Sequence, residues 1–374
     1  MHGRPRIPLG TPEDPEKVKT SKQRLALFSR LSNEVLERRA ARRYDPESMM
    51  LAAKLLEQNP EVYTVWNYRR EALQDTLQGE HGSEAADAAV KTELELTEAA
   101  LQKNPKSYAT WHHRKWLVQL GVVSLERELK LVTKLLAVDS RNFHAWAYRR
   151  FVVERACVPL EEEERYSTDC INANFSNYSA WHARTVLLPQ IHAAQPTTSL
   201  ADLLAADGAR PRPADSVPDQ AAAPGLVPLW ALGQELDVVQ QATFTDPEDQ
   251  SAWVYHRWLL SQLMAHHTAS SSKGQAALKE SEDMLNQEIM RCEALLESES
   301  DRSKCKWPIL TLARLLELRC KLTSQQTGTG GQQGGPDQQL IEKLYKELME
   351  IDPMRKGYYT DALEGKANVV TRPV

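Results

Sequence analysis

NPKSYATWHHR, at residues 104–114, is the stretch that decides the fold, because variants of it recur along the chain. Five copies align on a tryptophan, and each has an Asn or Asp seven residues before it. Four copies also place an aromatic residue three before the tryptophan and an arginine three after it, whereas the fifth has Gln250 and a displaced Arg257. The tryptophans are Trp66, Trp111, Trp146, Trp181 and Trp253. This repetition predicts an array of similar structural units around a tryptophan core.

Each copy predicts a helical hairpin. A leading helix ends at the Asn or Asp, a short turn follows, and a second helix begins just before the tryptophan. Four copies place a helix-capping residue four before the tryptophan, namely Ser107, Asn142, Asn177 and Asp249. Two of the intervals between tryptophans are 35 residues, which is the length of one hairpin. Stacked hairpins of this length form an α-solenoid, so we expect an all-α fold, an α-α superhelix of hairpin repeats.

The arginine of each copy has a predicted structural role. Residues three before, at and three after the tryptophan lie along one stripe of a helix. The aromatic residue, the tryptophan and the arginine are therefore expected to be neighbours, with the guanidinium near a ring and paired to a nearby acid. The arginines are Arg69, Arg114, Arg149 and Arg184.

Composition sets the remaining boundaries. The proline-rich residues 1–20 are expected to be extended, 21–189 to hold the first hairpins and 229–322 further ones. The Ala-, Pro- and Asp-rich insertion 190–228 predicts a flexible surface loop.

Three shorter segments complete the prediction. HHTASSSK, at 266–273, predicts a loop, and the Gly- and Gln-rich residues 323–337 predict a linker. Residues 338–374 are expected to form a C-terminal helix and tail.

The bulk properties exclude several classes of protein. A net charge of −5 and a pI of about 6.1 argue against binding nucleic acid through phosphate neutralisation. Five cysteines without a C-x-x-C pair indicate reduced thiols rather than a disulfide framework or a zinc knot. No segment has the apolar length of a signal peptide or a membrane span, so we expect a soluble cytoplasmic protein.

Few residues are candidates for chemistry in this chain alone, since the usual catalytic signatures are missing. His112 and His113 point about 100° apart on a helix and cannot chelate one ion together, so with His182 they predict no metal site. His2, near the terminus, either reaches into a partner's site or belongs to a disordered tail.

Lys106 and Arg141 form a more specific candidate. Each stands five residues before its tryptophan, in a predicted turn, and turns at one edge of a solenoid line up. Two cations converging on one rim beside Tyr108 could bind an anion such as a diphosphate.

The repeats resemble those of protein prenyltransferase α-subunits, whose hairpins carry Trp-x-x-Arg after an Asn/Asp-Pro turn. Three features are most similar to the α-subunits of Rab geranylgeranyltransferases (type II): the opening MHG with VKTS downstream, TDPEDQSAWVYHRWLL at 245–260, and IDPMRKGYYTDAL at 351–363. The resemblance is to a short form, without immunoglobulin-like and leucine-rich-repeat domains.

This resemblance implies a crescent of hairpins around a β-subunit that holds zinc and most of the lipid pocket. The heterodimer would transfer geranylgeranyl from geranylgeranyl diphosphate to C-terminal cysteines of Rab GTPases presented by a Rab escort protein. In the farnesyltransferase pattern a lysine occupies the place of Arg141, so Lys106, one repeat earlier, is implied to supply the charge that assists catalysis.

Two other functions stay open at this point. The chain could be the α-subunit shared by farnesyltransferase and geranylgeranyltransferase type I, which acts on CaaX tails. It could also be a non-catalytic scaffold of the tetratricopeptide kind, whose period near 34 fits two of the intervals.

Overall fold

The computed structural model describes residues 15–79, 84–193, 226–270, 275–327 and 335–366. These residues form α-helices and two short 3-10 turns, and no strand occurs among them. The chain divides into two compact units, 1–157 and 158–374. The predicted all-α hairpin repeats are confirmed, while most of the predicted insertion and His2 lie outside the described residues.

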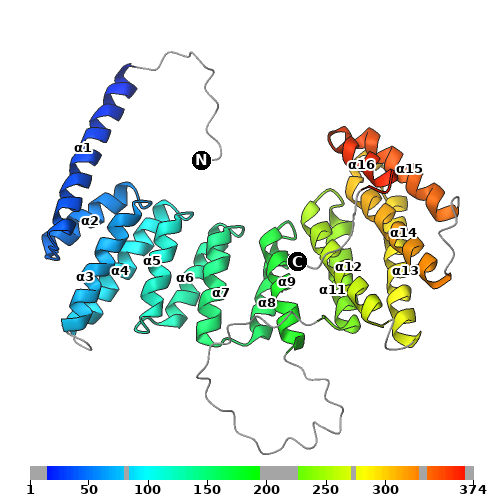
Figure 1. Cartoon of the computed structure of the whole chain (residues 1–374), viewed down its shortest axis with the longest axis horizontal. Coiled ribbons are helices and arrows are strands. Elements are labelled where there is room, and N and C mark those ends of the chain that lie inside the picture. Colours follow the sequence, from blue (N-terminus) through cyan, green and yellow to red (C-terminus); the bar gives the residue numbers. More distant parts are fainter. Residues whose placement is uncertain (1–14, 80–83, 194–225, 271–274, 328–334, 367–374) are drawn as a thin grey trace, which may run out of the picture. The chain divides into compact units, whose positions relative to one another are not determined.

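The first unit contains seven helices among its described residues (Figure 1). Helix pairs α2/α3, α4/α5 and α6/α7 are the hairpins of the first three tryptophans, and α1 packs on the first pair. The bounds are α1 (Pro15–Ala40), α2 (Pro46–Gln58), α3 (Tyr63–Gly79), α4 (Glu84–Lys103), α5 (Tyr108–Gln119), α6 (Leu125–Val138) and α7 (Phe143–Ala156).

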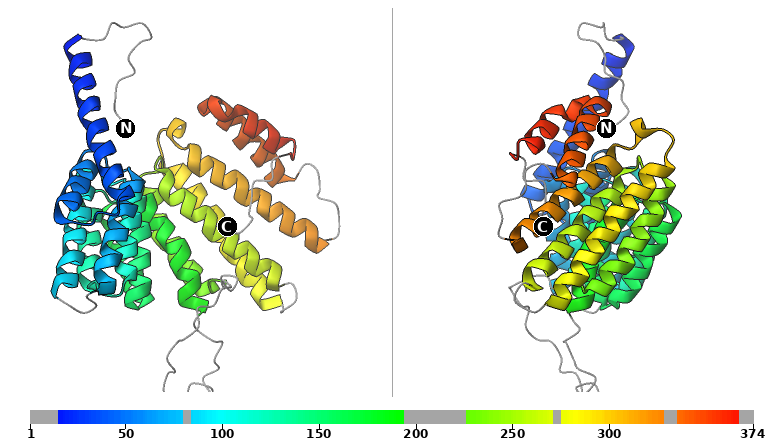
Figure 2. Two further views of the ribbon diagram at one scale, coloured as in Figure 1. Left: turned by 60° about the vertical axis from the view of Figure 1, so that its left-hand side comes forward. Right: turned by 90° about the vertical axis from the view of Figure 1, so that its right-hand side faces the viewer.

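The second unit continues the same construction. Figure 2 shows its successive helices α11 to α14 side by side, and α15 and α16 pack after them. The bounds are α8 (Leu160–Ala173), α9 (Tyr178–Ala193), α11 (Leu229–Thr245), α12 (Gln250–Ser270), α13 (Gln275–Ser298), α14 (Lys306–Thr327), α15 (Pro336–Ile351) and α16 (Lys356–Leu363). The 3-10 turns are Arg302–Lys304 and Pro353–Arg355.

Several predicted boundaries were wrong. Helix α1 begins at Pro15, so residues 15–20 are helical rather than extended. Helix α12 continues into the predicted loop as far as Ser270, because His267 is buried and its Nδ1 lies 3.0 Å from Ser281 Oγ. Helix α14 continues to Thr327 and α15 begins at Pro336, which shortens the predicted linker. Helix α16 was not predicted at all.

The repeat tryptophans are buried, and they also hold the turn of each hairpin in place. All five are between 0 and 6% exposed, and each indole N–H donates to the backbone carbonyl six residues earlier, at 2.7–3.1 Å. That carbonyl belongs to the turn between the two helices of the hairpin. The tryptophan therefore fastens the turn as well as filling the core, which satisfies its polar atom inside an apolar site.

The Asn or Asp seven residues before each tryptophan builds the same turn. In every repeat its side-chain oxygen accepts a hydrogen bond from the backbone N–H two residues later, at 3.0–3.3 Å. Asn and Asp form such turns readily because their short side chains reach their own backbone. The four predicted caps then accept from backbone N–H groups at the start of the second helix.

The arginines join one repeat to the next. Arg69 binds Glu93 and Arg114 binds Glu128, each through two nitrogens and with both partners buried. These acids stand eighteen residues before the next tryptophan, on its leading helix. The predicted pairing with an acid is thus confirmed for these arginines. The acid belongs to the following hairpin.

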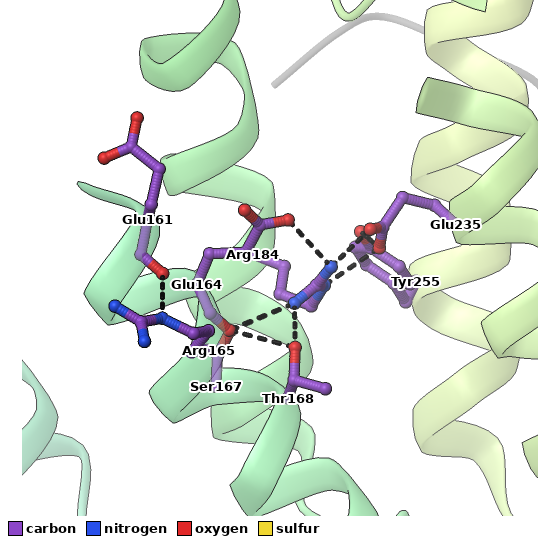
Figure 3. A network of polar contacts seen from close by, with 8 residues as sticks. All are labelled: Glu161, Glu164, Arg165, Ser167, Thr168, Arg184, Glu235 and Tyr255. Atoms are coloured by element: carbon purple, nitrogen blue, oxygen red, sulfur yellow. Dashed lines mark hydrogen bonds and ion pairs between the residues drawn. The ribbon is translucent and has the colours of Figure 1, made fainter. Parts of the chain in front are cut away.

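Figure 3 shows the corresponding network in the second unit. Arg184 Nε donates to Glu235 at 2.8 Å, and Arg184 also donates to Thr168 Oγ1 at 2.8 Å. Tyr255 donates to the same carboxylate at 2.6 Å. Burial opposes ionisation of Arg184, but its bonds to Glu235 outweigh that effect and raise its pKa. Burial, followed by the charge of Glu235, raises the pKa of Tyr255, so the phenol stays a donor.

The aromatic residues three before the tryptophan do not lie on a buried helix stripe with the tryptophan and the arginine, contrary to the prediction. Tyr63, Tyr108, Phe143 and Tyr178 are 44–67% exposed. Each is the first residue of its helix, so it lies at the turn, where no preceding helical turn covers it. The position is therefore available for contacts outside the repeat core.

One network has a titratable member that gives a stability prediction. His113 Nε2 lies 3.1 Å from Glu93, which also binds Arg69, and His113 Nδ1 accepts from Arg70. Burial lowers the pKa of His113, so the folded chain keeps it neutral. The unfolded chain takes up a proton near pH 6.5 that the folded chain does not, so stability falls below that pH.

Tyrosine stands in the register of His113 in three other repeats, and two of these tyrosines, Tyr148 and Tyr255, donate to the equivalent carboxylate. We therefore expect His113→Tyr to fold and to lose part of the stability change between pH 7 and pH 5. One proton contributes at most about 1.4 kcal/mol per pH unit. Thermal melts of both proteins across this range test the prediction, and identical pH profiles would contradict it.

Candidate functional site

The candidate site is built by two neighbouring turns of the first unit, at residues 104–108 and 139–143, which we call the turn pair. Asn142 Nδ2 donates to Pro105 O at 3.0 Å and so fastens one turn to the other. Lys106 and Arg141 occupy equivalent positions of these turns, and both side chains are exposed. The backbone N–H of Lys106 bonds to Asn104, and that of Arg141 bonds to Asp139.

The distance between the turns is short enough for their side chains to meet. Lys106 Nζ lies 3.6 Å from Asp139 Oδ2, so the ammonium of one turn reaches the carboxylate of the next. The two side chains are 58% and 38% exposed, which leaves this pair open to solvent. The predicted alignment of the turns is thus present, although the partner of Lys106 was not foreseen.

Aromatic side chains line the turn pair. Tyr108 is 67% exposed, and its ring meets His144 edge-on with 4.2 Å between ring centroids. Phe143 lies 3.9 Å from His144, also between ring centroids. His144 is only 8% exposed, and its Nε2 has no hydrogen-bond partner in the described part of the chain. Sequence reasoning missed His144.

The protonation of His144 follows from its surroundings. Burial is the largest cause that lowers its pKa, Glu61 acts in the opposite direction, and the charge of Lys106 lowers it further. The imidazole is therefore neutral near pH 7, and the positive charge of the turn pair resides on Lys106 and Arg141.

Charge varies from repeat to repeat at the position of Lys106. The corresponding residues are Glu61, Lys106, Arg141, Ser176 and Glu248. Only the second and third of the five repeats carry a cation there. The turn pair also contains the N-termini of α5 and α7, whose positive ends add to the two side-chain charges. Such an arrangement can bind an anion with several oxygens.

The turn pair offers no complete ligand set for a metal ion. No group of three or more His, Cys, Asp or Glu side chains that could hold a metal occurs in the described residues. His112 stacks on Tyr63 with 5.6 Å between ring centroids, and His113 is committed to Glu93. No helix within the described ranges is long and apolar enough to cross a membrane.

Comparison with known proteins assigns the repeats. The model of the protein prenyltransferase alpha subunit repeat matches residues 45–76, 90–121, 125–156, 160–191 and 232–263. Each match contains one of the five repeat tryptophans. A geranylgeranyl transferase type-2 subunit alpha of Dictyostelium discoideum is 31% identical over 96% of this chain and 98% of its own length. The chain belongs to the family of geranylgeranyl transferase type-2 alpha subunits.

Other members of the type-2 alpha family are longer than this chain. The protein of that name from Rattus norvegicus is 42% identical over 71% of this chain, and subunit alpha 1 from Arabidopsis thaliana is 45% identical over 71%. The chain spans only 43% and 34% of these relatives, respectively. The predicted resemblance to type-II α-subunits is confirmed at the level of the family.

A solved structure of Candida albicans protein geranylgeranyltransferase-I complexed with GGPP has the same fold. It superposes with a TM-score of 0.60 and 16% identity, covering 91% of this chain and 90% of the other. At this identity the similarity extends to the fold alone.

Proposed function

We propose that the chain is the α-subunit of a heterodimeric Rab geranylgeranyltransferase and that its turn pair faces the diphosphate of geranylgeranyl diphosphate. The observation that supports this proposal is the placement of Lys106 beside the turn of Arg141, in a chain related over nearly its whole length to a type-2 alpha subunit. A β-subunit would supply the rest of the active site. Rab GTPases presented by a Rab escort protein would be the substrates.

The proposed reaction makes one bond and breaks another. The sulfur of a Rab cysteine attacks C1 of the lipid, the C1–O bond breaks, and its electron pair leaves with the diphosphate. Lys106 and Arg141 would stabilise the charge that develops on the departing oxygen, since cations aimed at a leaving group act in the transition state. Tyr108 would add a neutral hydroxyl donor beside them, from an exposed position at the start of α5.

Zinc enters the proposal only through the partner. The described residues provide no ligand set for it, so we assign the ion to the β-subunit and derive no step of this chain through it. The tasks left to this chain are to bind the partner and to present the two cations.

The alternatives are less well supported. The relatives named above are type-2 alpha subunits, which favours type II over the α-subunit shared by farnesyltransferase and geranylgeranyltransferase type I. A tetratricopeptide-like scaffold does not account for the prenyltransferase repeat matches.

Affinity purification of the tagged chain from its own cells tests the proposal. We expect a one-to-one complex with a second subunit, zinc in that complex, and geranylgeranyl transfer to tails with two cysteines. Zinc content is measured on the complex and on the separated chain. Activity restricted to CaaX tails would support the farnesyl or type I alternative, and a zinc-free monomer with variable partners would support the scaffold.

A further inference from the structure

Asp139 takes part in both turns of the turn pair. Its Oδ1 accepts from the backbone N–H of Arg141 at 3.2 Å, and its Oδ2 lies 3.6 Å from Lys106 Nζ. One carboxylate thus contacts both residues that carry the positive charge of the site. It contacts Arg141 through the backbone and Lys106 through the charged group itself.

The other repeats show that the turn hydrogen bond does not require a negative charge. The equivalent residues are Asn59, Asn104, Asn174 and Asp246, and all form the turn hydrogen bond at 3.0–3.3 Å. Asparagine therefore builds the turn as well as aspartate does, and the negative charge at position 139 is not needed for folding of the turn. Its remaining oxygen faces the lysine of the preceding repeat.

We propose that Asp139 is a competing counter-ion, which lowers the affinity of Lys106 for diphosphate and so favours product release. This inference rests on the proposed function of the turn pair. Without diphosphate, the ammonium pairs with Asp139. A diphosphate must share or displace that partner, and it also meets the negative charge of the carboxylate.

The exposure of the pair fits such an exchange. An ion pair between solvent-exposed side chains is weak, so an incoming anion breaks it at little cost. A buried pair such as that of Arg69 and Glu93 would not exchange in this way, because separating it leaves a desolvated charge without a partner. Asp139 thus tunes the affinity for diphosphate without blocking the site.

Asp139→Asn in the intact heterodimer tests the inference, with calorimetric binding of inorganic diphosphate as the measurement. Because the amide keeps the turn oxygen and loses the charge, we expect diphosphate to bind about two- to fivefold more tightly. Asp246→Asn is the matched control, since it makes the same change in a turn whose cation position is Glu248, and it should leave binding unchanged. High salt should reduce the gain by screening the charges.

The outcomes separate this inference from the proposed function. Unchanged or weaker binding in Asp139→Asn, with an unaltered melting temperature, would overturn the counter-ion role. If Lys106→Ala leaves diphosphate binding unchanged, the proposed function of the turn pair fails as well. If Lys106→Ala weakens binding and Asp139→Asn does not tighten it, the counter-ion inference alone fails. In a chain that already carries Lys106→Ala, Asp139→Asn should increase the affinity for diphosphate by a smaller factor.

Discussion

Replacing Lys106 by alanine is expected to slow geranylgeranyl transfer about 10- to 150-fold in the proposed heterodimer. A charge-assisted hydrogen bond to the leaving diphosphate contributes about 1.5–3 kcal/mol, and removing that stabilisation slows the reaction by this factor. The lysine is exposed, and its backbone is held by Asn104 whatever the side chain, so the fold and the dimer should persist. Single-turnover transfer to a Rab substrate is the measurement.

Two controls make this result specific. Lys106→Arg keeps the charge and should retain most of the rate. Lys103→Ala removes a cation from the end of the preceding helix, where Lys103 pairs with Glu57 at 3.7 Å, and should have little effect. A full rate for Lys106→Ala with an intact dimer would remove this residue from the mechanism.

Replacing Glu235 by alanine is expected to cost about 3–5 kcal/mol of folding stability, because it leaves a buried guanidinium without its carboxylate. Arg184 and Glu235 are both buried, and Tyr255 loses its acceptor in the same variant (Figure 3). Arg184 keeps neutral partners, such as the hydroxyl of Thr168 and the backbone carbonyl of Glu164. The side-chain carboxylate of Glu164 is half-buried and lies 3.4 Å away, which is too distant to replace the two-pronged pair. Thermal and denaturant unfolding of the complex measure the loss.

The same unit contains a matched control. Arg302 and Glu347 also form a two-pronged pair, at 2.7 and 2.9 Å, but Arg302 is substantially exposed. Glu347→Ala should therefore cost less than about 1 kcal/mol. Replacing Arg184 by Met together with Glu235 by Leu should recover much of the stability lost by Glu235→Ala, since no buried charge remains. Equal losses for Glu235→Ala and Glu347→Ala would contradict the argument.

The sequence predicted the features that depend on local spacing. The hairpins, the buried tryptophans and caps such as Ser107 and Asn142 follow from residues within one repeat, so their positions could be derived without knowing the neighbouring repeat. The stripe argument failed for Tyr108 and its equivalents because it counted helical spacing alone and ignored that the predicted cap stands directly before this residue, where no preceding helical turn covers it. In the structure that residue is the first of the helix.

Contacts between repeats were harder to predict. Glu93, Glu128 and Glu235 share a fixed distance to the next tryptophan, which is a signal that could have identified them. Knowing that they meet the arginine of the preceding hairpin requires the packing of successive hairpins. The contact of Asp139 with Lys106 likewise depends on how far one turn lies from the next, and sequence spacing does not contain that distance.

The turn hydrogen bonds have a consequence for how such proteins diverge. In each repeat the residue five before the tryptophan has its backbone fixed by the preceding Asn or Asp and its side chain outside the core. Evolution can therefore replace Glu by Lys, Arg or Ser there with little selection from folding. The five repeats of this chain already contain four different residues at that position, so each turn is free to acquire its own ligand preference while the scaffold is inherited unchanged.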